Sequence, residues 1–153
     1  MMDFKGSQFE RDIILWGVRW YVAYPISYRQ LEEMMQERGV EVDHSILNRW
    51  VIKYTPVLDQ VFRQTKRPVG TSWRLDETYI SVKGQWKYLY RTNIVEQDQR
   101  AIKRKTRPML GFKSFWSAAI TLAGIELMHM IRKGQLKGRA KSRPAQQFYS
   151  LAA

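Results

Sequence analysis

The chain has 153 residues, and its 26 Lys and Arg against 14 Asp and Glu give a formal net charge of +12. It contains no cysteine, which excludes disulfide bonds and thiolate zinc sites. The apolar stretches 13–24 and 118–131 are too short to span a bilayer, so the sequence predicts a soluble cytoplasmic protein with no membrane partner.

The positive charge is concentrated in the second part of the chain. Residues 92–153 carry 12 basic and 3 acidic side chains, whereas residues 1–91 carry 14 and 11. Such a field attracts polyanions, of which nucleic acid is the usual one. Solubility or a general RNA contact would explain the same charge, so charge alone leaves these alternatives open.

The first predicted helix begins a helical module over residues 1–65. Ser7 and Glu10 have the spacing of a capping box, in which each side chain bonds the other's backbone N–H. Apolar residues follow at helical spacing, and the helix is expected to end before Pro25.

A second capping box predicts the next helix. Ser27 with Gln30 opens a segment expected to be helical over residues 28–38. Gly39 follows as a C-terminal cap, because glycine adopts the left-handed conformation found at helix ends.

The third predicted helix, residues 44–53, is capped by Asp43, and Pro56 is expected to begin a separate helix over 56–62. Two helices joined by a short turn over residues 27–53 fit a helix-turn-helix, whose second helix enters the major groove. An ordinary helical hairpin fits too, and the basic charge of the chain favours DNA binding. The outward residues predicted to contact DNA are His44, Ser45, Asn48 and Arg49.

Residues 66–72 contain Pro68 and Gly70 and are predicted to be a linker. Two runs rich in aromatic and β-branched residues, 73–82 and 85–91, then predict a β-hairpin with a Lys83–Gly84 turn.

Asp76 lies in the middle of the first predicted strand, where aspartate is uncommon. A metal ligand is one explanation, because Mg²⁺ prefers carboxylate oxygens. A solvated carboxylate, or one paired with a neighbouring Arg or Lys, is the alternative and is favoured without further context.

A helix predicted over residues 94–106 carries one acidic residue at the head of a basic stripe. The residues sharing this face are Glu96, Arg100, Lys103, Arg104 and Arg107. They could hold a metal beside a phosphodiester, or form ion pairs such as Glu96 with Arg100 on a solvated face, and periodicity does not separate the two. Ser114 is expected to cap a long apolar helix over 115–132, and the basic tail, residues 136–153, is predicted to be flexible.

Three strings resemble successive segments of the insertion-sequence-six family of DDE transposases. They are WRLDETYISVKGQWKYLYR, NIVEQDQRAIKR and RPMLGFKSFWSAAITLAGIELMHMIRKGQ. The resemblance implies a ribonuclease-H-like domain that holds two Mg²⁺ ions on three carboxylates, of which Asp76 matches the first and Glu96 the last. Gln99 stands where the family usually has histidine.

The spacing indicates an internal deletion. Asp76 and Glu96 are only 20 positions apart, whereas the family fold implies several further strands and helices between them, on the order of 60–80 residues. Asp98 points about 200° away around its helix and Glu77 faces the opposite side of its strand, so neither replaces the middle aspartate. The chain is therefore expected to bind DNA without cleaving or joining it.

The predicted fold class is α+β and mostly helical. A helix-turn-helix module precedes a truncated DDE domain over residues 73–135, namely a remnant of the ribonuclease-H-like fold with a β-hairpin and two C-terminal helices. The expected partners are the terminal inverted repeats of double-stranded DNA and either a second copy or a full-length transposase in a mixed oligomer. A non-catalytic regulator of full-length transposase and a general basic nucleic-acid-binding protein are the alternative functions.

Overall fold

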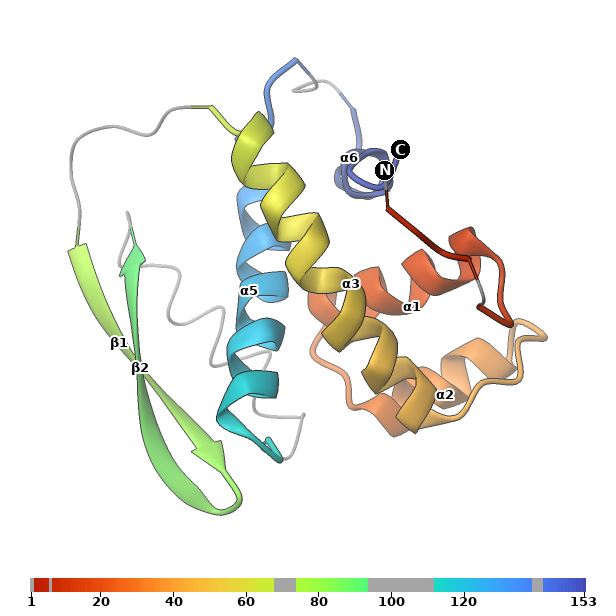
Figure 1. Cartoon of the computed structure of the whole chain (residues 1–153), viewed down its shortest axis with the longest axis horizontal. Coiled ribbons are helices and arrows are strands. Elements are labelled where there is room, and N and C mark those ends of the chain that lie inside the picture. Colours follow the sequence, from red (N-terminus) through yellow and green to blue (C-terminus); the bar gives the residue numbers. More distant parts are fainter. Residues whose placement is uncertain (1, 6, 68–73, 94–111, 139–141) are drawn as a thin grey trace.

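The computed structural model describes residues 2–5, 7–67, 74–93, 112–138 and 142–153, with backbone only for residues 74–78 and 89–93. This part of the chain is mostly helical with one small antiparallel sheet, which confirms the predicted α+β class (Figure 1). Its elements are α1 (Arg11–Ala23), α2 (Tyr28–Gln36), α3 (His44–Thr65), β1 (Arg74–Val82), β2 (Gln85–Asn93), α5 (Phe115–Arg132) and α6 (Pro144–Ser150). No helix in these ranges combines the length and apolar character needed to cross a membrane.

Helix α1 begins later than predicted. Its N-cap is Glu10, with no side-chain cap, so the capping box proposed for Ser7 and Glu10 is wrong. The segment before α1 packs its aromatic side chains on α3 instead: the ring of Phe4 stacks on Tyr54 at 4.9 Å, and the ring of Phe9 meets Trp50 edge-on at 5.1 Å. Burial of these rings outweighs one capping interaction of about 1 kcal/mol.

Helix α2 has the predicted caps. The Ser27 hydroxyl accepts from the Gln30 backbone N–H, and the Gln30 side chain accepts from the Ser27 N–H at 2.8 Å. At the other end Gly39 has a φ of +76°, and the N–H of Val40 donates to the carbonyl of Met35 at 3.0 Å. The left-handed glycine thus closes the helix and turns the chain toward α3.

Helix α3 is capped by Asp43 as predicted but does not stop near Pro56. The Asp43 carboxylate accepts from the Ser45 N–H at 2.7 Å, and a single helix of 22 residues then runs to Thr65 with Pro56 inside it. The predicted break was wrong because the buried face is continuous, with Trp50, Tyr54, Leu58 and Phe62 all packed in the core. A proline inside a helix costs about 3 kcal/mol, and burying four large side chains contributes more than that.

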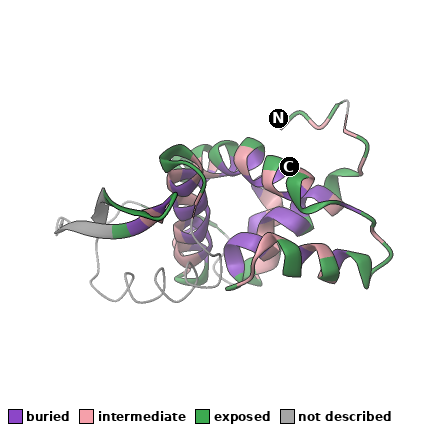
Figure 2. Cartoon of the chain, turned by 90° about the horizontal axis from the view of Figure 1, so that it is seen from below, coloured by how far each residue is buried: buried purple, intermediate pink, exposed green. Residues whose placement is uncertain are grey.

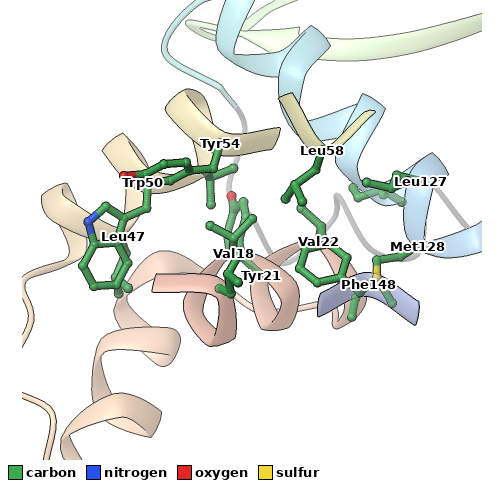
Figure 3. Close-up of a cluster of buried hydrophobic side chains, with 14 of the residues drawn as sticks. Val18, Tyr21, Val22, Leu47, Trp50, Tyr54, Leu58, Leu127, Met128 and Phe148 are labelled. Atoms are coloured by element: carbon green, nitrogen blue, oxygen red, sulfur yellow. The ribbon is translucent and has the colours of Figure 1, made fainter. Parts of the chain in front are cut away.

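One hydrophobic core joins α1, α3, α5 and α6 (Figure 3). Gly124 of α5 lets this helix approach its neighbours closely, because a Cβ built there would lie 2.5 Å from Val22 Cγ1 and 2.9 Å from Thr55 Cγ2. Helix α5 therefore packs mainly on α3 and α1.

Helices α3 and α5 run in the same direction. Lys66, which follows α3, pairs with Leu136, which follows α5. The Arg67 N–H donates to the Gln135 carbonyl at 2.9 Å across the same junction. The chain between the two helices must therefore return along the length of α5 before that helix can begin.

The C-terminal segment is ordered against this core, and its predicted flexibility is wrong. Helix α6 places Phe148 in a fully buried position, with Leu151 also buried. The Arg19 guanidinium of α1 donates to the Tyr149 hydroxyl at 2.8 Å. The prediction was based on the basic residues before α6 and did not take this short amphipathic helix into account.

The β-hairpin lies beside the helical body (Figures 1 and 2). Its turn, Lys83–Gly84, has positive φ at both positions, 50° and 75°, as a two-residue hairpin turn requires. Ile80 and Val82 are buried, whereas Tyr79 is exposed and Ser81 is partly exposed. The free edge of β1 is paired near the turn, because the Phe112 N–H donates to the Ser81 carbonyl at 3.0 Å.

Candidate nucleic-acid interface

The first turns of α3 present an exposed polar stripe next to the junction with α2. Ser45 and Arg49 are exposed and Asn48 is partly buried, while Leu47 and Trp50 on the opposite side face the core. The structure thus places three of the four predicted DNA-contacting residues on the outward side of this helix. Serine, asparagine and arginine can all donate hydrogen bonds to base edges or phosphates.

The fourth predicted residue, His44, is already engaged. Its Nδ1 lies 3.0 Å from the Glu32 carboxylate of α2 and 3.4 Å from the Asp43 carboxylate. The Glu32 carboxylate also accepts the His44 backbone N–H at 3.2 Å. His44 therefore links α2 to α3, and Nε2 is the ring nitrogen that remains for another partner.

Glu32 is the functional residue that sequence reasoning missed at this junction. It satisfies one of the unpaired N–H groups at the start of α3, as a negative group at a helix N-terminus is expected to do. Its signal in the sequence is weak, because Glu32 precedes His44 by 12 positions and no local pattern joins them.

Asp43 completes this acidic junction. A hydrogen bond from the Ser45 side chain, followed by one from the Ser45 backbone, holds the pKa of the Asp43 carboxyl below its usual value. Asp43 is therefore ionised wherever the protein is folded near neutral pH.

The α2–α3 segment does not share the basic character of the whole chain. Residues 27–53 contain four basic and five acidic side chains, a net charge of −1. Non-specific attraction to phosphates is therefore weak here. Any DNA contact by α3 has to depend on the hydrogen bonds that its stripe makes.

A buried hydroxyl network fixes α2 on the rest of the protein. The Tyr21 and Tyr28 rings stack at 3.9 Å, and their hydroxyls are hydrogen-bonded to each other, with Tyr28 also bonded to Thr121 of α5. Burial raises the pKa of Tyr21 to about 12 and also raises the pKa of Tyr28. The network thus ties the start of α2 to both α1 and α5.

The predicted catalytic residues are only partly described. Asp76 lies in β1, where its Cα partner across the hairpin is Arg91 of β2. The other predicted residues of this site lie outside the described residues, namely Glu96, Arg100, Lys103, Arg104 and Arg107.

The residues present do not fit a site for two metal ions. No acidic residue occurs between Glu77 and Glu96 in the sequence, so the carboxylate that would bridge the ions in a three-carboxylate site has no candidate there. Within the described ranges, one group of three potential ligands lies close together, Glu32, Asp43 and His44. Those groups already bond one another at the positive end of α3, which disfavours a cation.

The middle of the chain is similar to a known protein family. A family model described as a DDE domain matches residues 70–92 and 91–135. The match consists of two pieces that meet at Arg91 and Thr92, which agrees with a domain shortened between Asp76 and Glu96.

The chain is also similar to curated transposases of insertion sequences. A transposase for insertion sequence-like element IS431mec from Staphylococcus aureus strain Mu50 is 46% identical over 91 residues, which cover 60% of this chain and 41% of that protein. A transposase for insertion sequence element IS257 in transposon Tn4003, also from Staphylococcus aureus, is 44% identical over 91 residues with the same shares. The match thus spans less than half the length of these relatives. No solved structure matches the chain.

Proposed function

We propose that the chain is a DDE transposase of an insertion sequence with an internally shortened DDE domain, and that it binds insertion-sequence DNA but lacks strand-transfer activity of its own. The observation that carries this proposal is the absence of any acidic residue between Glu77 and Glu96. Two-metal phosphoryl transfer needs ligands that hold both ions about 4 Å apart, and two carboxylates alone do not provide them.

DNA binding is assigned to α2 and α3, acting as a helix-turn-helix on the terminal inverted repeats. Asn48 and Arg49 are the side chains suited to bidentate contacts with adenine and guanine, and Ser45 suits a phosphate. His44 has a smaller role than predicted, because its Nδ1 lies 3.0 Å from Glu32. Its main contribution is to position the start of α3.

Asp76 and Glu96 are the two carboxylates that would remain of the family's metal site, with weak affinity for Mg²⁺. The basic residues proposed to contact phosphates beside them are Arg100, Lys103, Arg104 and Arg107. In this chain they add to DNA affinity without supporting chemistry, since the sequence has no acidic residue between Glu77 and Glu96 to serve as the middle ligand.

A non-catalytic regulator is the second candidate. It is favoured by the combination of a complete hydrophobic core and a missing catalytic carboxylate. Such a chain can occupy terminal repeats, or join a mixed oligomer with full-length transposase, and thereby lower its activity.

The DNA-binding assignment is tested by fluorescence anisotropy with terminal-repeat duplex and a scrambled duplex of equal length. Arg49→Ala is expected to weaken terminal-repeat binding by about 5- to 150-fold, the value of one bidentate base contact. Arg63→Ala is the matched control, because Arg63 lies on the same helix about 21 Å away and pairs with Asp59 at 2.8 Å. Equal losses in both variants would contradict recognition by the first turns of α3.

The catalytic assignment is tested by strand transfer with Mg²⁺ and terminal-repeat DNA. The wild-type chain and Asp76→Asn are both expected to give no product. Product formed by the wild type and lost in Asp76→Asn would refute the proposal. The regulatory role predicts that added chain lowers product formation by a full-length transposase, and unchanged product would exclude that role.

A further inference from the structure

The outward side of the hairpin is an exposed aromatic surface formed by Tyr79, Trp86 and Tyr88. Their exposed fractions are 46%, 71% and 54%. Tryptophan is highly buried on average in folded proteins, so an indole exposed to this degree is unusual. Exposed groups of large aromatic side chains commonly mark binding surfaces.

The strand register brings these rings together. Tyr79 lies directly opposite Tyr88, and Ser81 lies opposite Trp86. The Tyr79 and Tyr88 rings are 4.7 Å apart between centroids, inclined at 58°. Ile80 and Val82 alternate with them and are buried on the other side of the strand. The aromatic surface therefore has packed residues behind it.

Two exposed lysines lie at the turn end of this surface. Lys83 forms the turn, whereas Lys87 pairs with Ile80 and therefore belongs to the other face of the hairpin. Lys113 is brought to the same end because the neighbouring Phe112 carbonyl accepts the Lys83 N–H at 2.9 Å. Residues 79–88 contain no acidic side chain, so this half of the hairpin carries only positive formal charge.

We propose that the outward side of the hairpin binds single-stranded DNA, with bases stacked on Trp86, Tyr88 and Tyr79 and phosphates near Lys83 and Lys113. Aromatic platforms beside a positive backbone track are the general solution for binding single strands, because every base has a π-face. This site goes beyond the proposed duplex recognition by α3 and does not require it.

Ring spacing favours a single strand over a duplex. Residues two apart on one strand are separated by about 7 Å, roughly twice the 3.4 Å rise between stacked base pairs in a duplex. Bases that stack on successive rings must therefore spread apart, which an unpaired strand allows and a paired duplex resists.

The experiment is anisotropy titration of the full chain with a short fluorescent oligothymidylate and, separately, with terminal-repeat duplex. Trp86→Ala and Tyr88→Ala are each expected to weaken oligothymidylate binding by about 5- to 150-fold while leaving duplex binding unchanged. Lys83→Gln is expected to reduce the slope of log affinity against log salt by about 0.7. Tyr24→Ala is the matched control, because Tyr24 is 41% exposed at the end of α1 and should leave both affinities unchanged.

Three outcomes would overturn the assignment. The first is unchanged oligothymidylate binding in both aromatic variants, and the second is an equal loss in Tyr24→Ala. The third is a wild-type dimer that Trp86→Ala converts to monomer in sedimentation, which would show that a second copy covers this surface. Loss of duplex binding in Arg49→Ala with intact oligothymidylate binding would support two separate sites.

Discussion

The Glu32 carboxylate of α2 lies 3.0 Å from Nδ1 of His44 in the first turn of α3. This contact joins the two helices of the candidate interface and also places negative charge where a phosphate would approach.

Replacing Glu32 by glutamine is therefore expected to tighten duplex binding. The change removes one charge near the end of α3 that is proposed to face DNA, and at 8–10 Å in water one unit charge contributes about 0.4–0.5 kcal/mol, roughly a 2-fold gain at low salt. Stability should change by no more than about 1 kcal/mol, because the pair is exposed. Anisotropy at several salt concentrations measures the gain. Glu33→Gln is the control. An equal gain in that variant would show that the location of the Glu32 charge beside His44 does not matter for DNA affinity.

Asp43 predicts a pH dependence of stability. Hydrogen bonds from Ser45 lower its pKa from the usual 3.8, so the ionised cap stabilises the folded state above that value, and this contribution is lost as pH falls through the lowered pKa. Asp43→Asn keeps a good N-cap but does not titrate. The difference in unfolding free energy between wild type and Asp43→Asn should be constant at neutral pH and shrink in acid. Urea unfolding at a series of pH values tests this, and a difference that stays constant in acid would refute it.

Gly124→Ala is expected to destabilise the folded protein. A Cβ at this position would lie 2.5 Å from Val22 Cγ1, and overpacking of this kind costs about 1–3 kcal/mol. In a chain of this size the loss lowers Tm by about 2–4 °C per kcal/mol. Gly17→Ala is the comparison, because its nearest neighbour would be Leu47 at 3.2 Å and the gain in helix propensity offsets the strain. Thermal unfolding that ranks the two variants in the opposite order would contradict the packing of α5 on α1.

Phe148 tests whether the C-terminal helix is part of the fold. Its side chain is fully buried, so Phe148→Ala should lower stability by about 3–5 kcal/mol. Phe115→Ala removes the same group from a position that is 45% exposed, and a surface change of this kind costs about 0.5 kcal/mol or less. Urea unfolding followed by circular dichroism compares them. A small effect at Phe148 would mean that α6 does not dock on the core.

Local capping chemistry was predictable from sequence. Ser27 with Gln30, Asp43 and Ser114 all cap helices as expected, and Lys83–Gly84 forms the expected turn. Each of these signals depends on a few neighbouring residues and one or two hydrogen bonds. At these positions tertiary packing leaves the local hydrogen bonds in place.

The predictions failed where contacts between residues distant in the sequence determine the local structure. Pro56 lies inside α3 because the buried face continues across it, and Ser7 does not cap α1 because Phe4 and Phe9 pack on α3. In the candidate site, exposure of Arg49 follows from helical periodicity, whereas the bond between Glu32 and His44 depends on how α2 crosses α3. No sequence pattern predicts how these two helices cross.

The shared direction of α3 and α5 sets a lower limit on the length of the chain that joins them. Helices that run the same way need a return path, here about 27 Å along α5, which any stretch of more than about eight extended residues can span. What lies on that path is free to vary, because the helical body makes its main contacts without it. A connection shorter than that limit would prevent α5 from keeping this direction, and Gly124 would no longer lie against Val22 and Thr55.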